Sequence, residues 1–417
     1  MKIKQVLTAT GYTGFYFDDQ VAIKQGAVMD GFMYLGEPVT ENFTAIRQPG
    51  EALSIMLMLE NGSIAYGDCA AVQYSGTGGR DPLFIAKEFE TFFNTHIKQQ
   101  LIGLNVSKFR KNADYFDHLH IEGTRLHTAL RYGITQALLD ATAKANQKTI
   151  AEIVRKEYNI RSKKYMPVPI FAQTGDERYT NVDKMIIKSI DVLPHALINN
   201  IETKLGHDGE ILKEYVNWLT NRVIQKRTNP DYHPIFHIDV YGLLGVIFNQ
   251  NIKKIFDYLK ALSEIAKPFL LRIEGPVDKG NRTETMEALR DLTAMIDADD
   301  TVHVEIVADE WCNTYEDVQY FTENRAGHMI QVKTPDLGGV NNIIEALRYC
   351  LINNMGAYSG GTCNETNISA EITTSIALAC QAKQVLAKPG MGADEGIMIV
   401  KNHMMRQLAI IKERHGQ

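Results

Sequence analysis

The stretch FHIDVYG, residues 236–242, is a short apolar run that ends on Asp239. Two later stretches repeat the arrangement: LLRIEGP, residues 270–276, ends its run on Glu274, and VEIVADE, residues 304–310, ends its run on Asp309. The spacings are 274 − 239 = 35 and 309 − 274 = 35 residues, each about the length of one strand–helix unit. The pattern predicts three consecutive βα units that each carry a carboxylate at the end of the strand.

The same rhythm continues on both sides of these three units. Short apolar stretches alternate with amphipathic helical ones, such as 251–267, 283–298 and 340–354, and we predict strands at 168–173, 192–195, 235–240, 270–274, 304–309, 329–333, 356–359 and 385–388. Eight such units predict a TIM-like (β/α)8 barrel. A doubly wound open sheet shares the alternation, but the number of units and the absence of a G-x-G-x-x-G turn after the first strand favour the barrel.

The first part of the chain has a different, α+β pattern. Residues 52–60 alternate as a strand does, Asn61 and Gly62 form a turn, and residues 63–66 return, which predicts a hairpin. Residues 129–146 have apolar side chains three and four positions apart and predict a helix. We therefore predict two domains: an α+β N-terminal capping domain, residues 1–162, and a (β/α)8 barrel catalytic domain, residues 163–417.

The composition limits the classes of function. The 417 residues are 45% hydrophobic and 23% charged, with a net charge of −6 and both signs mixed along the chain. This argues against nucleic acid or a membrane surface as a partner, since both need a basic face. No run approaches the ~20 apolar residues of a membrane span, and no cationic leader precedes an apolar stretch. Five scattered cysteines indicate a reduced protein, and we expect a soluble, cytoplasmic location.

The three strand-end acids predict a metal site. Barrel enzymes carry their active sites at the carboxyl ends of the strands, so Asp239, Glu274 and Asp309 are expected at one rim. Three converging carboxylates repel one another unless a divalent cation neutralises them, and oxygen-only ligation indicates Mg²⁺. One such acid alone is as well explained by a solvated loop or a helix cap. Glu310 is a weaker candidate because the alternation of the strand turns it away from Asp309.

Other strands bring further candidates to the same rim. Gln331 and Lys333 are two residues apart, so both side chains face the same way. A buried lysine near a divalent metal can be neutral and act as a general base, although a surface or phosphate-binding lysine is the alternative interpretation. On the opposite arc, the first strand ends in Gln173 and the second carries His195. A packed or capping histidine is the alternative for His195.

Two glycine-rich segments complete the candidate site. Residues 359–366, SGGTCNET, form a tight turn entering a helix, where backbone N–H groups suit a substrate carboxylate, and Thr362 and Cys363 are candidate substrate contacts. Cys363 lacks an implied histidine partner, which argues against a nucleophile. Residues 73–80, QYSGTGGR, do not match a phosphate-binding loop. They are interpreted as a lid with Gln73 as a substrate contact, or as an ordinary surface loop.

Taken together, three acids followed by a lysine on strands three to six resemble the enolase superfamily, whose members pair Mg²⁺ with a lysine or histidine base. Most of the chain further resembles the methylaspartate ammonia-lyase family within it. The matching segments are GFYFDDQVAIKQGAVMDGFMYLGEPVT, QYSGTGGRDPLF, VLPHALINNIETKLG, HIDVYG, RIEGP, QVKTPDLGG and GGTCNET. The second strand lacks the K-x-K pair of other superfamily members and carries His195 in its place, which disfavours cycloisomerases and racemases.

The resemblance implies an ammonia-lyase that converts L-threo-3-methylaspartate to mesaconate, in glutamate degradation. It implies Mg²⁺ on Asp239, Glu274 and Asp309, Lys333 as the base on one face, and His195 on the other face. It also implies K⁺ as an activator, a homodimer, and substrate contacts from Gln73, Gln173, His195, Gln331, Thr362 and Cys363. A racemase or cycloisomerase acting on another carboxylate, and a barrel that only binds ligands, remain the alternatives.

Overall fold

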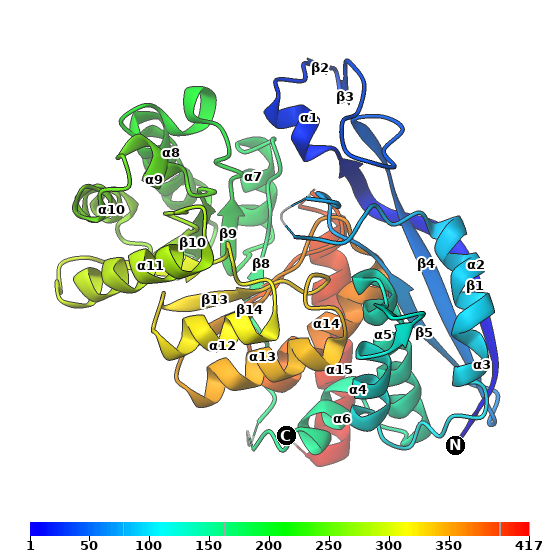
Figure 1. Ribbon diagram of the computed structural model, residues 1–417. Helices are drawn as coiled ribbons and strands as arrows, with labels where there is room; N and C mark the ends of the chain where they lie inside the picture. The colour runs from blue at the N-terminus through cyan, green and yellow to red at the C-terminus, as the bar shows by residue number, and fades with distance from the viewer. Residues whose placement is uncertain (78, 162–163, 392, 417) are drawn as a thin grey trace.

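The computed structural model describes residues 1–77, 79–161, 164–391 and 393–416. Figure 1 shows a barrel surrounded by helices, with an N-terminal sheet and its helices packed against one side. The predicted boundary between residues 162 and 163 lies outside the described residues. Among the described residues, no helix is long and apolar enough to cross a membrane.

Eight parallel strands close into a barrel in chain order, β8 to β15, with β15 paired to β8. The predicted barrel is confirmed, and the doubly wound alternative is wrong. All eight predicted strands are present, and the second and seventh have the predicted limits. The strands are β8 (Ile170–Phe171), β9 (Val192–His195), β10 (Ile235–Asp239), β11 (Leu271–Glu274), β12 (Val304–Ala308), β13 (Met329–Val332), β14 (Gly356–Ser359) and β15 (Val385–Leu386).

The barrel helices bury one apolar face each against the strands. The helix predicted at 251–267 is α10 (Ile252–Ala266), whose first turn is capped by the side chain of Asn251, and those predicted at 283–298 and 340–354 are α11 and α13. The remaining bounds are α7 (Thr180–Ile187), the π-helical turn η1 (Ile201–Leu205), α8 (Glu210–Lys226), α9 (Leu243–Ile247), α11 (Arg282–Asp297), α12 (Tyr315–Glu323), α13 (Val340–Ile352), α14 (Asn367–Cys380) and α15 (Glu395–His415).

The N-terminal part is built on a three-stranded antiparallel sheet in the order β1 (Ile3–Asp18), β4 (Arg47–Leu59), β5 (Ile64–Cys69). The predicted hairpin is β4 and β5. Strand β1 was not predicted, because its central residues are mostly exposed and do not alternate between apolar and polar. The other elements are α1 (Gln20–Lys24), β2 (Met29–Asp30), β3 (Met33–Tyr34), α2 (Ala86–His96), α3 (Lys98–Leu101), α4 (Arg110–Asp117), β6 (His120–Ile121), β7 (Thr124–Arg125) and α6 (Ile150–Glu157).

Helix α5 (Thr128–Ala145) joins the two parts. Nearly all its residues are buried because it lies between the N-terminal sheet and the barrel helices. A Cβ at Gly133 would lie 2.5 Å from the Cys69 sulfur, and a Cβ at Gly67 would lie 2.2 Å from the Gly133 carbonyl oxygen. Only glycine allows the helix and β5 to approach this closely, so the N-terminal sheet is held firmly beside the barrel.

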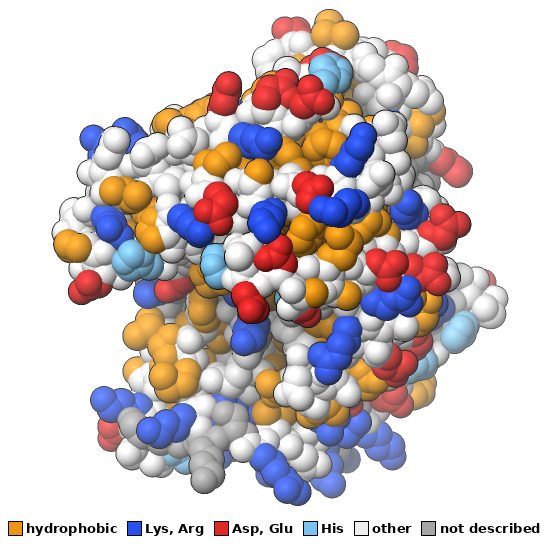
Figure 2. All heavy atoms as spheres, turned by 90° about the vertical axis from the view of Figure 1, so that its left-hand side faces the viewer, with side chains coloured by type: hydrophobic (Ala, Val, Ile, Leu, Met, Phe, Trp, Pro, Cys, Tyr) orange, Lys and Arg blue, Asp and Glu red, His pale blue; other side chains and the backbone are white. Residues whose placement is uncertain are grey.

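The outer surface of the barrel carries both charge signs. Figure 2 views the molecule from the left-hand side of Figure 1 and shows Lys and Arg side chains interspersed with Asp and Glu on this face. The described residues on this face do not form a basic patch of a single sign, of the kind that nucleic acids require.

Candidate active site

Three acids lie at the carboxyl ends of consecutive barrel strands. Asp239 ends β10, Glu274 ends β11, and Asp309 follows β12. Asp239 and Glu274 are paired residues of adjacent parallel strands, so both reach the same rim. The three residues are 3%, 0% and 6% exposed. Burial raises the pKa of Asp239 and of Glu274, and the negative charge of Asp309 raises both further.

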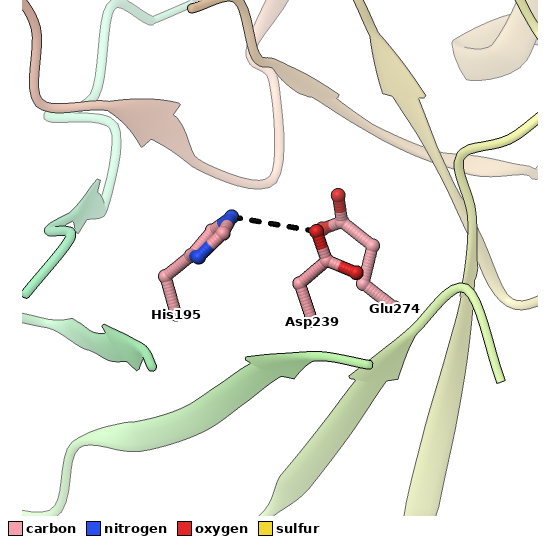
Figure 3. Close-up of side chains that lie close together, drawn as sticks. All are labelled: His195, Asp239 and Glu274. Carbon is pink, nitrogen blue, oxygen red and sulfur yellow. Dashed lines mark ion pairs between the residues drawn. The ribbon is translucent and has the colours of Figure 1, made fainter. Parts of the chain in front are cut away.

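His195 also points into this group (Figure 3). One ligand atom from each of His195, Asp239 and Glu274 lies within 4.8 Å of the others, and Nε2 of His195 is 3.6 Å from Oδ2 of Asp239. Asp309 is held differently: its Oδ1 lies 3.0 Å from Nζ of Lys333. The predicted ligand set contains Asp309, whereas the group of candidate ligand atoms found within 4.8 Å of one another among the described residues contains His195 in its place.

Lys333 follows β13 and is 7% exposed. Its ammonium lies 3.0 Å from Asp309 and 4.0 Å from Glu310, and it donates a hydrogen bond of 3.2 Å to Oδ1 of Asn313. Burial lowers the pKa of this amine, but Asp309 and Glu310 raise it by more, so the pKa is raised overall. With these carboxylates ionised and no cation bound, the ammonium form of Lys333 is favoured; the neutral amine predicted from the sequence concerns the site with a divalent metal bound.

The charges at the rim are unbalanced. Asp239, Glu274 and Asp309 carry three negative charges when ionised, and Lys333 carries one positive charge, which leaves a surplus of two (3 − 1 = 2) before the charge of the more exposed Glu310 is added. Buried charges that lack partners are costly. A divalent cation would cancel this surplus, and carboxylate oxygens are the ligands that hard cations prefer. The residues at the rim thus fit such an ion.

The buried surroundings of His195 favour its neutral form, although it lies beside the acids. Burial lowers the pKa of this imidazole to about 4, although Asp309 acts in the opposite direction. The ring stacks beside Phe171 at a centroid distance of 5.8 Å, and its Nδ1 has no hydrogen-bond partner among the described residues. His195, Ala196 and Leu197 have φ of 65°, 68° and 49°. Such left-handed residues are sparse and concentrate at functional sites.

The turn after β14 is held from below by a buried ion pair. Nζ of Lys388 donates to Oε1 of Glu365 at 2.8 Å and to the Gly360 carbonyl at 2.7 Å. Both charged side chains are fully buried. Tyr132, from α5, donates to the second oxygen of Glu365 at 2.8 Å. The side chain of Thr366 caps α14. The turn that carries Thr362 and Cys363 is thereby fixed to both parts of the molecule.

Gln73 reaches this turn from the N-terminal part. Its Nε2 donates to Oδ2 of Asp18 at 2.6 Å, and Sγ of Cys363 donates to its Oε1 at 3.4 Å. Arg47 holds Asp18 with two hydrogen bonds of 2.7 and 2.8 Å. Farther along the loop, Arg80 pairs with Asp336 of the barrel at 3.2 Å. The predicted lid segment, whose Gly78 lies outside the described residues, contacts the barrel at both ends.

The two glutamines predicted at the rim are both buried. Gln173 follows β8 and is 7% exposed. Gln331 donates from Nε2 to Oε1 of Glu274 at 2.5 Å and to the Tyr358 hydroxyl at 2.6 Å. Tyr358, in turn, donates to Oε2 of Glu274 at 2.7 Å. The orientation of Glu274 is thus set by side chains that reach it across the barrel from β13 and β14.

The sequence analysis missed several polar residues that support this site. They are Asp18 and Arg47 beneath Gln73, the pair of Glu365 and Lys388, and a set inside the barrel: His237, Arg272, Tyr358 and Gln384. The positions of two of these residues could have been predicted from their spacing in the sequence. His237 and Arg272 lie two residues before Asp239 and Glu274, so strand alternation turns each toward the same face as the acid it precedes.

Comparison with known proteins covers nearly the whole chain. Residues 1–159 match the family described as "Methylaspartate ammonia-lyase N-terminus", and residues 163–413 match "Methylaspartate ammonia-lyase C-terminus". The methylaspartate ammonia-lyase of Clostridium tetanomorphum is 61% identical over 99% of this chain and 100% of its own length. That of Citrobacter amalonaticus is 53% identical over 99% of this chain and 100% of its own length.

Solved structures agree with these matches. The Mg-complex of β-methylaspartase from Clostridium tetanomorphum superimposes with a TM-score of 0.97 at 61% identity, over 99% of this chain and 100% of that one. Muconate lactonizing enzyme from Pseudomonas fluorescens shares the fold, with a TM-score of 0.58 over 90% of this chain and 84% of its own, at 15% identity.

Proposed function

Because the chain belongs to the methylaspartate ammonia-lyase family of the enolase superfamily, and is thus a carbon–nitrogen lyase, we propose that it eliminates ammonia from L-threo-3-methylaspartate to give mesaconate. The observation that carries this proposal is the buried rim where three carboxylates face one ammonium. Such a site suits removal of a weakly acidic proton beside a carboxylate. We assign this reaction to the degradation of glutamate, in which mesaconate is an intermediate.

In this proposal, Asp239, Glu274 and Asp309 hold Mg²⁺. A Mg-complex structure is known for the relative from Clostridium tetanomorphum. His195 lies close enough to be a ligand, but Mg²⁺ takes oxygen ligands in preference to imidazole nitrogen, so we assign His195 to the substrate. When bound, Mg²⁺ would supply positive charge that stabilises the substrate carboxylate as negative charge builds up on it.

Lys333 is the proposed base that removes the proton from C3. When Asp309 is a metal ligand, its charge raises the pKa of Lys333 less. The burial of the amine, which lowers this pKa, then shifts Lys333 toward the neutral form, although Glu310 still acts in the opposite direction. The neutral amine takes the C3 proton, and the electrons of the C3–H bond move onto the adjacent carboxylate. They return to form the C2–C3 double bond as the C2–N bond breaks with its electron pair on nitrogen. The substrate nitrogen, which enters as an ammonium group, leaves as ammonia.

His195 faces the substrate from the other side. Its imidazole is neutral at pH 7, because burial lowers its pKa to about 4. A neutral imidazole can accept a proton from the opposite stereoisomer, or stabilise charge by donating a hydrogen bond. The remaining proposed substrate contacts are Gln73, Gln173, Gln331, Thr362 and Cys363, which are buried or half-buried around this space. K⁺ activation, a homodimer and a cytoplasmic location stay predictions from the sequence.

The deciding experiment incubates the purified protein with Mg²⁺ and L-threo-3-methylaspartate. We expect the ultraviolet absorbance of a conjugated unsaturated acid to rise together with an equal amount of ammonia. Omitting K⁺ tests the activator. Racemisation without ammonia release would instead support the alternative of a racemase. Protein that binds 3-methylaspartate without turning it over would support a barrel that only binds ligands.

A further inference from the structure

A chain of buried hydrogen bonds runs through the barrel interior to Glu274. Arg272 lies at the far end of this chain. Its Nε donates to Oε2 of Glu305 at 2.6 Å, and its Nη1 donates to Oε1 of Gln384 at 2.7 Å. Gln384 and Nδ1 of His237 are 2.8 Å apart, and Nε2 of His237 is 2.6 Å from Oε2 of Glu274. The three central side chains belong to β10, β11 and the residue before β15.

The guanidinium of Arg272 fixes the direction of every bond in this chain. A guanidinium can only donate, so the oxygen of Gln384 must face Arg272 and its NH₂ group must face His237. Nδ1 of His237 is then an acceptor and carries no hydrogen. The single ring hydrogen is therefore on Nε2, and it is donated to Glu274. An arginine on β11 thus selects the histidine tautomer that serves a carboxylate on the same strand.

The imidazole of His237 has little freedom to move. It is 0% exposed, and Phe171 stacks on it at a centroid distance of 4.3 Å with the planes 14° apart. Oε2 of Glu274 accepts from both His237 and Tyr358, at 2.6 and 2.7 Å. Gln331 donates to the other oxygen. Three donors from different strands hold the plane of this carboxylate.

We propose that His237 is a positioning residue that holds Glu274 in the orientation in which it binds Mg²⁺, with Gln384 and Arg272 selecting its tautomer. The inference rests on the proposed function, since it concerns the same cation. If His237 only filled the core, its substitution would change the stability of the protein but not its affinity for the cation. Partners that orient a metal ligand typically affect metal affinity by about 10- to 100-fold.

The first test measures Mg²⁺ dissociation constants by calorimetry, well below the melting temperature of each variant. We expect His237→Phe, which keeps an aromatic ring against Phe171 but removes the donor, to weaken Mg²⁺ binding by about 10- to 100-fold. His237→Gln places an amide N–H near the former Nε2 and should restore most of the affinity. The matched control is His403→Phe, since His403 is also buried but bonds to Ser375.

The second test reads the tautomer directly and needs no metal. In ¹⁵N-histidine NMR of the full chain, we expect His237 to be neutral with its hydrogen on Nε2. Gln384→Glu replaces the NH₂ donor by an acceptor, so a hydrogen should appear on Nδ1. A wild-type signal with the hydrogen on Nδ1 would overturn the inference, and this measurement decides the matter if His237→Phe does not fold.

Failure of the inference and failure of the proposed function give different results. If wild-type protein binds no Mg²⁺, or if Glu274→Gln binds it equally well, the proposed metal site is wrong, and the inference is wrong with it. If Glu274→Gln loses affinity while His237→Phe binds as tightly as wild type, the metal site stands and only the role of His237 is refuted.

Discussion

Two buried acid–base clusters lie in the same barrel, and they differ in how completely they are satisfied. Under the turn after β14, Lys388 and Glu365 form a one-to-one pair, and Tyr132, Thr334 and the Gly360 carbonyl bond to their remaining atoms. At the barrel rim, three carboxylates are accompanied by one ammonium, that of Lys333, which pairs directly with Asp309. Both clusters are almost entirely buried.

This difference indicates that the pair of Lys388 and Glu365 stabilises the fold, whereas the cluster at the barrel rim binds a ligand. A pair with balanced charges, in which both carboxylate oxygens and the ammonium have hydrogen-bond partners, does not need a bound ion to neutralise it. An unbalanced cluster is tolerated only where a bound ion or substrate completes it, so residual charge in a buried site is itself evidence of function. The predictions that follow test whether the two clusters behave in these different ways.

The largest effect is expected for Lys333→Ala. Loss of the base should lower kcat for 3-methylaspartate by about 10²- to 10⁴-fold, measured from mesaconate absorbance. Mg²⁺ affinity should stay within a few-fold of wild type, because no carboxylate is removed. Lys253→Ala, on the exposed face of α10, is the control and should leave turnover unchanged. Near-normal turnover of Lys333→Ala would dismiss the base assignment.

Lys388→Met should act on stability. Removing one partner leaves Glu365 buried and unpaired, which costs about 3 to 5 kcal/mol in the free energy of unfolding. Denaturant unfolding of Lys388→Met and of the double variant Lys388→Met/Glu365→Gln measures this free energy. The double variant should recover part of the lost stability, because it no longer buries an unpaired carboxylate. A stability equal to that of wild type would contradict the view that this pair holds the turn.

The ligand set can be tested by a pair of substitutions. Asp309→Asn should weaken Mg²⁺ binding by about 10- to 100-fold, as expected when a charged oxygen ligand is lost. His195→Gln should leave the dissociation constant within about 3-fold of wild type, since Mg²⁺ prefers oxygen. The reverse result would mean that the cluster of His195, Asp239 and Glu274 is the true metal site.

His195→Ala should change the choice between substrate stereoisomers. If His195 serves one face and Lys333 the other, the ratio of kcat/KM for L-threo- and L-erythro-3-methylaspartate should shift by about 10-fold. Thermal unfolding of the same variant controls for folding. An unchanged ratio, with reduced rates for both isomers, would show that His195 acts on a step common to both.

The smallest effect concerns pH in metal-free protein. Burial, and then Asp309, raise the pKa of Asp239 in the folded state. The folded protein therefore binds this proton more tightly than the unfolded chain, and the resulting stability is present at low pH and lost as pH rises through the folded-state pKa. We measure the free energy of unfolding in EDTA at about pH 5 and pH 8. Over this range, it should fall by about 1 kcal/mol more for the wild type than for Asp239→Asn. Added Mg²⁺ should abolish the difference.

Much of the fold was predictable because the barrel strands are local apolar runs. The runs before Asp239, Glu274 and Asp309 each correspond to one strand, and parallel pairing then brings their ends to one rim. Strand β1 was not predictable in this way. It lies at the edge of its sheet, and its central residues face solvent, so no alternation marks them.

The partners inside the site were harder to predict, because they depend on how the barrel closes. His237 and Gln384 are 147 residues apart in the sequence, and only the meeting of β10 and β15 across the interior places them together. The protonation state of Lys333 also depended on distance, since Asp309 and Glu310 raise its pKa against the effect of burial. Residue type at a strand end does not reveal which of two opposing influences is larger.

Gln73 is anchored by Asp18 and Arg47, all from the first 80 residues, while every proposed proton-transfer and metal-binding group lies on the barrel. The N-terminal part thus contributes to substrate binding, and the barrel carries the groups proposed for metal binding and proton transfer. Because Gln73 is a proposed substrate contact, we expect substitutions around it in the N-terminal segment to change which amino acids fit the site. The bond-breaking apparatus, on separate strands, would be inherited intact.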